Sequence, residues 1–386
     1  MTTLVGIPRR TERPIGYFVH HQGRGHAERC ADLIQALPST RPVTVFCAEP
    51  DCLPALPPQA EVRAIPSLFE ATGAETPMDQ VPQPATVHCA PLGWPGIRRA
   101  MGGIAAWFAD ADPALIVTDV SAEIAQLARL CSVPHVAVLQ HGDRNDPGHH
   151  AAYDGAAGLL APCAAPLAQP DWDRWRDRIH FAGGLGVRTA APGKAEARAR
   201  LGLSADAPVV VVISGGGGNG IGAAPLAVGA RAVPEAHWIT IGHVASDWHA
   251  TEPDNLSHHG WVDAPMDYVA AADVVIASTG NTTCHQILAV GRPWLAVPEW
   301  RYFDEQVEKA RALDRAGAAT HMPSLPASIG AWRRALAQAR DGHDAARQRA
   351  LVRPDAAANA AAWLDDLAKS LWASATSPHD LPLAGE

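Results

Sequence analysis

The stretch PVVVVISGGGGNG, residues 208–220, places five consecutive β-branched residues directly before a glycine-rich turn. Helix-like sequence follows the turn, so the stretch predicts a buried strand, a glycine turn and a helix. Near the N-terminus, IGYFVHHQGRGH at residues 15–26 has the same order, and helical apolar spacing then continues over residues 26–37 until Pro38. Two such units far apart in one chain indicate two α/β domains.

Each unit begins a series of apolar runs separated by helical or turn-rich sequence. Strands are expected at residues 15–20, 43–48, 114–119 and 135–140, and again at residues 208–214, 237–242, 273–278 and 293–298. Strands that alternate with helices predict parallel, doubly wound sheets. The proline-rich residues 66–96 are expected to form a long loop, and the Gly/Pro/Ala-rich residues 182–193 are expected to link the domains.

Composition narrows the class of protein. The 386 residues are 47% hydrophobic, with 31 basic and 40 acidic side chains and a net charge of −9, which excludes disorder and argues against a nucleic-acid partner. No apolar run approaches the roughly 20 residues of a membrane span. The seven scattered cysteines lack a Cys-x-x-Cys pair and are expected as reduced thiols. The histidines lack zinc-like spacing, so no metal site is expected.

Two polar loops follow predicted strands of the second series. Residues 214–220 satisfy G-x-G-x-x-G, but the next strand ends in Gly242-His243 instead of the acidic, ribose-binding residue of dinucleotide folds. STGNTTCHQ, residues 278–286, opens a second helix. Together the loops predict a diphosphate site at a topological switch point. A glycine turn without a ligand, and Thr282 and Thr283 as simple helix caps, remain the alternatives.

A longer pattern resembles family 28 glycosyltransferases. Residues 260–310 read GWV-(x)3-M-(x)5-AD-VVIASTGNTT-(x)5-AVGRPWLAVPEW-(x)4-EQ-(x)3-A, and residues 20–29 read HHQGRGHAER. GxGH, SGGGG, GWV, STGNTT and EQ occur in the order of that family. The resemblance implies the α/β GT-B fold, in which two Rossmann-like domains with parallel sheets face a cleft and a C-terminal helix crosses back.

The expected domains are residues 14–185 for the acceptor, residues 186–354 for the nucleotide sugar, and residues 355–373 as the returning helix. The apolar spacing of that helix predicts a buried stripe of Trp363, Leu364, Leu367, Leu371 and Trp372.

The resemblance also implies the residues of a donor site. Trp261 and Val262 would read the base, and Glu305 and Gln306 would bind sugar hydroxyls. The diphosphate would lie against Ser214, Gly215, Gly216, Gly217, Gly280, Asn281, Thr282 and Thr283. Gln286 stands where the family has a ribose-binding glutamate, and its amide lacks the charge-assisted part of that hydrogen bond. The identity of the nucleotide therefore stays open.

His26 is the predicted general base, because it follows the glycine turn at the start of a helix. Asp119 ends a strand at the same edge of the sheet. It resembles the aspartate that orients this base in related glycosyltransferases. Its position suits a cap of the next helix equally well. The residues expected near the acceptor are Arg24, Gly25, His141 and Asp143, although an ordinary solvated Arg24 is an alternative. Helix N-termini and loop amides would neutralise the diphosphate, so metal independence is expected.

The resulting hypothesis is a metal-independent, inverting glycosyltransferase that moves a sugar from a nucleotide diphosphate sugar, UDP-linked by resemblance, to a hydroxyl acceptor. No cofactor beyond this co-substrate is expected. A nucleotide-sugar 2-epimerase or hydrolase, and a non-catalytic nucleotide-sugar-binding protein, are the alternatives.

The sequence leaves the nature of the acceptor open. A small-molecule and a lipid-linked acceptor are both compatible with it. Residues 92–108 are either a lipid or membrane patch or an ordinary packed helix. A cytoplasmic location is expected without integral membrane association, and a peripheral position on the inner membrane face stays open, as does the oligomeric state.

Overall fold

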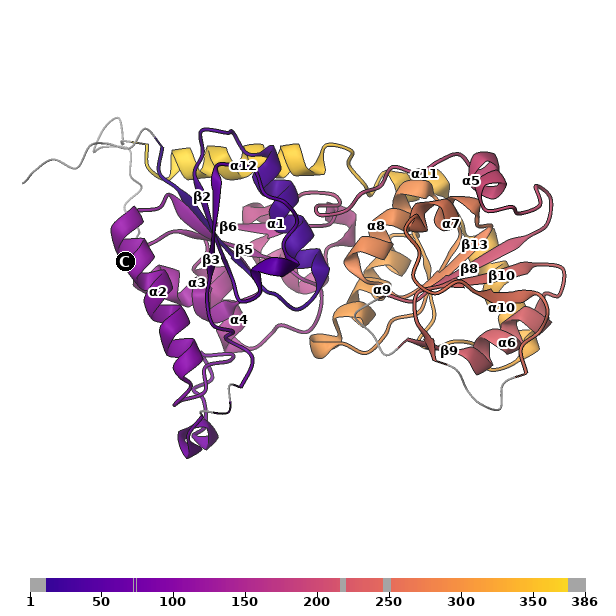
Figure 1. The fold of residues 1–386 in the computed structure, drawn as a ribbon, viewed down its shortest axis with the longest axis horizontal. Helices are drawn as coiled ribbons and strands as arrows, with labels where there is room; N and C mark the ends of the chain where they lie inside the picture. Colours follow the sequence, from indigo (N-terminus) through magenta and orange to yellow (C-terminus); the bar gives the residue numbers. More distant parts are fainter. Residues whose placement is uncertain (1–11, 72, 74, 216–219, 246–250, 374–386) are drawn as a thin grey trace, which may run out of the picture.

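The computed structural model describes residues 12–71, 73, 75–215, 220–245 and 251–373. They form two α/β domains side by side, the first in indigo and magenta and the second in rose and orange (Figure 1). Each domain has its own parallel sheet, as the alternation of strands and helices predicts.

The first domain contains a seven-stranded sheet in the order β3-β2-β1-β4-β5-β6-β7. Its elements are β1 (Ile15–Val19), α1 (Arg24–Ala36), β2 (Val43–Cys47), η1 (Pro50–Cys52), β3 (Ala60–Ala64), η2 (Pro77–Gln80), α2 (Pro95–Ala111), β4 (Leu115–Asp119), α3 (Ala122–Leu130), β5 (His135–Val138), α4 (Pro147–Asp154), β6 (Gly158–Ala161), η3 (Ala165–Leu167), η4 (Pro170–Arg178) and β7 (Ile179–Phe181).

The central strands of this sheet are covered on both faces. Tyr17 and Val19 of β1 pack into the core that contains α1, whereas Phe18 packs with α2 and α3 on the other face. Every position of β1 is buried, which explains why IGYFV is continuously apolar instead of alternating. The strand order reverses between β1 and β4, so the residues that end these strands border a crevice.

The second domain contains a six-stranded sheet in the order β12-β10-β8-β13-β14-β15, and a two-stranded sheet of β9 and β11. Its elements are α5 (Lys194–Arg200), β8 (Val209–Ile213), β9 (Ile221–Gly222), α6 (Ala223–Ala232), β10 (His237–Ile241), β11 (Val244–Ala245), β12 (Leu256–His258), α7 (Pro265–Ala271), β13 (Val274–Ala277), α8 (Asn281–Val290), β14 (Trp294–Ala296), η5 (Tyr302–Asp304), α9 (Glu305–Arg315), β15 (Thr320–His321), α10 (Ile329–Asp341) and α11 (Ala345–Arg349).

All eight strands expected from the sequence form. The switch point of the second sheet lies between β8 and β13, the two strands that precede the predicted diphosphate loops. Sequence reasoning missed the remaining strands. Among these, β3 (AEVRA) is an edge strand with mostly exposed side chains, and β6 has only four residues, so neither produces a recognisable apolar run.

The chain returns to the first domain through α12 (Ala356–Ser370), drawn in yellow beside α1 (Figure 1). Ala360, Ala361 and Leu364 pack into the core of the first sheet, which confirms the returning helix. The predicted domain boundaries fall between β7 and α5 and directly before α12.

The predicted stripe on this helix is only partly correct. Leu364 is fully buried, and Trp363 and Leu367 pack against the first core. Leu371 and Trp372 follow the end of the helix at Ser370 and are 39% and 42% exposed, although Nε1 of Trp372 still donates to the Ala114 carbonyl at 2.9 Å.

Residues 92–108 form most of α2, which packs on the sheet. Ile104, Trp107 and Phe108 are buried in its interface, whereas Arg98 and Arg99 are exposed. The second half of the segment is therefore a helix packed on the sheet, whereas Leu92 at its start is 48% exposed. None of the described helices combines the length and the apolar composition that a membrane crossing requires.

Candidate active site

His26 and Asp119 meet at the switch point of the first sheet. His26 lies in the first turn of α1, which begins after Gly23, a glycine with φ of 99°. Asp119 is the last residue of β4 and is completely buried. The Nδ1 atom of His26 lies 2.8 Å from Oδ1 of Asp119. The two residues singled out in the sequence thus form one hydrogen-bonded pair.

Two further side chains hold the Asp119 carboxylate. Arg29 donates from Nε to Oδ2 and from Nη2 to Oδ1, both at 2.8 Å, and the Tyr17 hydroxyl donates to Oδ2 at 3.2 Å. Burial by itself would raise the pKa of Asp119, but the Arg29 guanidinium and His26 hold it well below its usual range. Burial raises the pKa of Tyr17 well above its usual value, so the phenol remains a donor.

The ionised carboxylate fixes the proton arrangement of His26. Because Asp119 only accepts hydrogen bonds, a neutral His26 carries its proton on Nδ1 and donates it to Oδ1. Nε2 is then left with its lone pair and is able to take a proton from a ligand. The side chain of His26 is 16% exposed, so the imidazole is accessible from the crevice.

Three cavities lie along the junction of the domains. The glycine-loop cavity has a volume of about 460 Å³ and is bordered by Ser214 and Gly215. The central cavity has a volume of about 150 Å³ and is bordered by Asn281. The aromatic cavity has a volume of about 550 Å³ and is bordered by Phe69. Each is lined from both domains. His26 lines both the central and the aromatic cavity, so its ring stands between them.

Most of the predicted donor residues gather in the glycine-loop cavity. Its lining includes Ser214, Gly215, Trp261, Val262, Thr282, Thr283 and Gln286. Asn281 lines the central cavity instead, and Gly280 is the N-terminal cap of α8. Gly216 and Gly217 lie outside the described residues.

Glu305 and Gln306 have different surroundings. Glu305 lines the central and aromatic cavities, whereas Gln306 is buried and its Oε1 accepts from the backbone of Thr279 at 3.3 Å and of Glu299 at 2.8 Å. The side-chain oxygen of Gln306 therefore holds the two loops that surround it. Of the pair, Glu305 presents its carboxylate to the cavities.

The loop before Glu305 has a strained backbone. Phe303 and Asp304 adopt φ values of 61° and 52°, which are unfavourable for residues other than glycine. The carbonyl of Phe303 accepts from the backbone N–H of Asp143 at 2.6 Å, and the guanidinium of Arg144 lies 4.6 Å from the Phe303 ring. Contacts from the first domain thus help to hold Glu305 at the junction.

The predicted acceptor residues do not form one group. Gly25 lines the central cavity, but Arg24 borders the glycine-loop cavity with a side chain that is 91% exposed. His141 lines the central cavity and is buried; burial lowers its pKa to about 3, and its Nε2 bonds to the Leu167 carbonyl at 2.7 Å. Asp143 is exposed and accepts a hydrogen bond from the side chain of Asn145.

Of the two cavities that His26 lines, the aromatic cavity has the larger volume. His20 stacks on Phe69 with ring centres 4.5 Å apart, and Tyr302 and Phe303 face it from the second domain. Arg144 adds a buried guanidinium to the lining. This cavity therefore suits a flat or ring-shaped ligand with a polar group.

Sequence reasoning missed several charged or polar residues at or next to these cavities, among them Tyr17, Arg29, Arg144 and Lys309. A usable signal existed for Arg29, because it follows His26 by three residues on one helix and so shares its face. Arg144 directly follows the predicted Asp143. Nothing local in the sequence marks Tyr17 or Lys309.

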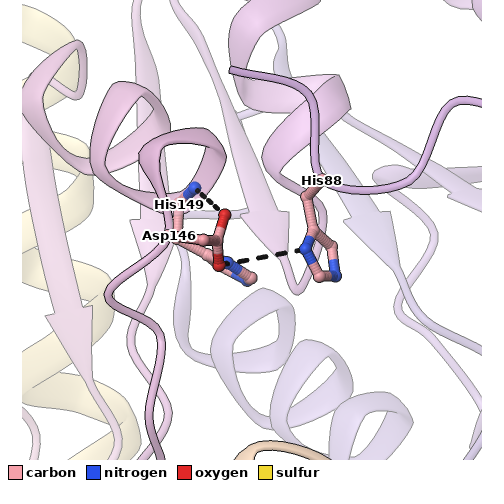
Figure 2. Close-up of side chains that lie close together, drawn as sticks. All are labelled: His88, Asp146 and His149. Atoms are coloured by element: carbon pink, nitrogen blue, oxygen red, sulfur yellow. Dashed lines mark hydrogen bonds and ion pairs between the residues drawn. The ribbon is translucent and has the colours of Figure 1, made fainter. Parts of the chain in front are cut away.

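Among the described residues, His88, Asp146 and His149 form one group with spacing that suits a metal ion (Figure 2). Asp146 caps α4 through Oδ1, and its Oδ2 accepts from Nδ1 of His149 at 2.5 Å and lies 3.9 Å from Nδ1 of His88. Asp146 and His149 are thus already hydrogen-bonded to each other, whereas Nδ1 of His88 lies beyond hydrogen-bond distance of the carboxylate. His21, Glu49 and Glu70 form a second group, in which His21 and Glu70 share a hydrogen bond.

The sequence also contains two Asp-x-Asp pairs, an arrangement that often binds metal in sugar transfer. They are Asp110 with Asp112 and Asp171 with Asp173. Asp112 pairs with Arg13, and none of these four aspartates lines the three cavities.

A family model matches part of the second domain. Residues 245–331 match the family model of the glycosyltransferase family 28 C-terminal domain. This part of the second domain is therefore similar to the C-terminal domain of family 28 glycosyltransferases. The matched residues include Trp261, the loop that opens α8, and Glu305, and the match confirms the resemblance drawn from the sequence.

A curated relative is also described as a glycosyltransferase. An uncharacterized glycosyltransferase of Methanosarcina acetivorans is 30% identical over 98 residues, which is 25% of the chain and 25% of that protein. The chain thus aligns with about a quarter of the length of this relative.

Solved structures resemble the whole fold. The glycotransferase of kitacinnamycin matches with a TM-score of 0.65 at 18% identity, over 92% of the chain and 99% of that structure. Arabidopsis thaliana UGT89C1 complexed with UDP matches with a TM-score of 0.60 at 18% identity, over 93% and 100%. These similarities establish the GT-B arrangement expected from the sequence.

Proposed function

We propose that the protein is a glycosyltransferase that moves a sugar from a nucleotide diphosphate sugar to a hydroxyl group of an acceptor. The position of His26 carries the proposal: held by Asp119, it stands between the aromatic cavity and the central cavity. The central cavity adjoins the loop that opens α8, which lies within the residues that match the family 28 domain. A sugar in the central cavity and an acceptor in the aromatic cavity would meet at Nε2.

In the proposed reaction, Nε2 of His26 accepts the proton of the acceptor hydroxyl. The oxygen forms a bond to the anomeric carbon as the bond from that carbon to the β-phosphate oxygen breaks, and the nucleoside diphosphate departs with the electron pair. Attack opposite the leaving group inverts the anomeric centre. Asp119 stabilises the imidazolium that forms, and its hydrogen bond keeps the ring oriented.

We propose a UDP-linked donor. The support is the sequence resemblance and the fold shared with UGT89C1, whose structure is described as complexed with UDP. The base and ribose would lie in the glycine-loop cavity, near Trp261 and Gln286, with the diphosphate near Thr282 and Thr283. Amides at the start of α8 would bind the phosphates, and the reaction would need no metal or other cofactor. A cytoplasmic location belongs to the same proposal.

A binding and turnover experiment tests the proposal. UDP and UDP-sugars should raise the melting temperature of the protein, whereas NAD should not, and chelation by EDTA should leave turnover with cell-extract acceptors unchanged. His26→Ala should lower the turnover about 10²- to 10⁴-fold and change UDP affinity less than about 2-fold. Wild-type turnover in this variant would contradict the assignment of the base.

The same assay separates the alternatives. A 2-epimerase or hydrolase would consume the UDP-sugar without any acceptor, and a non-catalytic binding protein would bind it and form no product. Stabilisation by NAD and not by UDP would contradict the proposed function as a whole.

A further inference from the structure

Lys309 is a buried cation in the central cavity. It lies on α9, one turn after Glu305, and lines the cavity with His26, Arg29 and Asn281. Its side chain is only 9% exposed. Lysine is almost never fully buried unless its ammonium is paired, because desolvation of a charge is costly.

The ammonium of Lys309 has no close counter-charge in the described part of the protein. It forms no hydrogen bond with any residue that the structure describes, and Oε1 of Glu305 lies 3.9 Å from it. The other carboxylate oxygen of Glu305 is 4.0 Å from Nη2 of Arg144. One carboxylate thus stands between two buried cations without a hydrogen bond to either.

Four further titratable groups close to Lys309 supply no negative charge. Burial lowers the pKa of His141 to about 3 and of His285 to about 4, with a contribution from the ammonium in both cases. Burial raises the pKa of the Cys163 and Cys284 thiols to about 12. Near pH 7 these groups are neutral imidazoles and thiols, so a second anion for the cavity has to come from a ligand.

The position of the cavity indicates which ligand group this is. Asn281 opens α8 and lines the central cavity, and Thr282 and Thr283 from the same turn line the adjoining glycine-loop cavity. We propose that Lys309 binds the β-phosphate of the nucleotide diphosphate. The inference rests on the proposed function, because it requires a diphosphate that spans the two cavities.

Lys309 would also act during sugar transfer. When the bond between the anomeric carbon and the β-phosphate oxygen breaks, the electron pair stays on the phosphate, and the ammonium stabilises the added charge without giving up a proton. The interaction is stronger in the transition state than with the bound donor, so it lowers the barrier as well as the dissociation constant.

The test compares two nucleotides that differ by the β-phosphate. Dissociation constants for UDP, UMP and a UDP-sugar are measured by calorimetry for the wild type, Lys309→Met, Lys309→Arg and Arg311→Met. Arg311 lies on the same helix with a side chain that is 55% exposed, so its variant controls for the loss of one positive charge. Lys309→Gln replaces the Met variant if the latter does not fold.

Lys309→Met should weaken UDP about 10- to 100-fold and UMP less than about 2-fold, as expected for loss of one charge-assisted hydrogen bond. Lys309→Arg should restore most of the UDP affinity, and Arg311→Met should change neither nucleotide. Equal loss of affinity for UDP and UMP would overturn the inference. Loss of affinity for a UDP-sugar alone would also overturn it, because Lys309 would then only position Glu305. Failure of the wild type to bind UDP would overturn the proposed function as well.

Discussion

At the residue scale, Asp119 organises the site. One buried carboxylate accepts from His26, Arg29 and Tyr17, which come from the first helix and the first strand of the chain. The orientation of His26 therefore depends on a group that lies 93 residues further along the sequence. The carboxylate orients the imidazole and neutralises the buried Arg29 at the same time.

The first prediction concerns Asp119→Asn. The amide no longer selects the Nδ1–H form of His26 and leaves Arg29 buried without its counter-charge. Turnover should fall about 10²- to 10⁴-fold, and the free energy of unfolding should fall by about 3 kcal/mol or more. Steady-state kinetics and urea denaturation measure the two effects.

Tyr17→Phe is the matched control for this prediction. It removes one hydrogen bond to Asp119 but keeps the contacts of His26 and Arg29. It should cost about 1 kcal/mol of stability and keep most of the turnover. An Asp119→Asn variant as active as Tyr17→Phe would contradict the role assigned to the carboxylate.

At the element scale, α12 ties the end of the chain to the first domain. Its Asp365 accepts from Nε of Arg41 at 2.8 Å, and both residues are buried. Burial by itself would raise the pKa of Asp365, but hydrogen bonds from Lys369 and Arg41 lower it. Because α12 follows the second domain in sequence and packs on the first, it links the two halves of the molecule.

Asp365→Ala should destabilise the protein by about 3 kcal/mol, because Arg41 stays buried and loses its main counter-charge. Asp366→Ala, at the exposed neighbouring position on the same helix, should change the stability by less than about 0.5 kcal/mol. Urea denaturation of both variants measures the difference. Equal midpoints would show that the buried pair does not anchor α12.

At the scale of the whole molecule, buried neutral histidines couple stability to pH. His141 and His285 are completely buried and lie near the domain junction, and burial lowers their pKa values to about 3 and about 4. In the unfolded chain a histidine titrates near pH 6.5. Between these values the unfolded state binds more protons than the folded state, so stability rises with pH in this window.

Acidification from pH 6.5 to pH 4.5 should therefore lower the free energy of unfolding, with a slope of at most about 1.4 kcal/mol per pH unit for each of these imidazoles. Urea denaturation at a series of pH values measures the slope. His285→Gln should reduce it by the share of one histidine. A free energy that is flat over this window would show that these imidazoles are protonated in the folded state.

The sequence by itself determined the two parallel α/β domains and the loops at both switch points. Continuous β-branched runs such as residues 209–213 form buried strands, and glycine turns after them lead into helices wherever the tertiary structure places them. It also singled out His26, which follows the glycine turn after a strand, and Asp119, which ends one. These features can be predicted because the spacing of apolar residues and the positions of glycines depend only on neighbouring residues in the sequence.

Only the tertiary structure decided which polar groups touch. Tyr17 and Arg29 reach Asp119 because β1 and β4 are neighbours in the sheet, and Gln306 is withdrawn from the cavities because two loops use its side chain. Lys309 lines the same cavity as His26 only because the domains meet there. Such contacts depend on burial and charge pairing between distant segments, and no local period in the sequence encodes them.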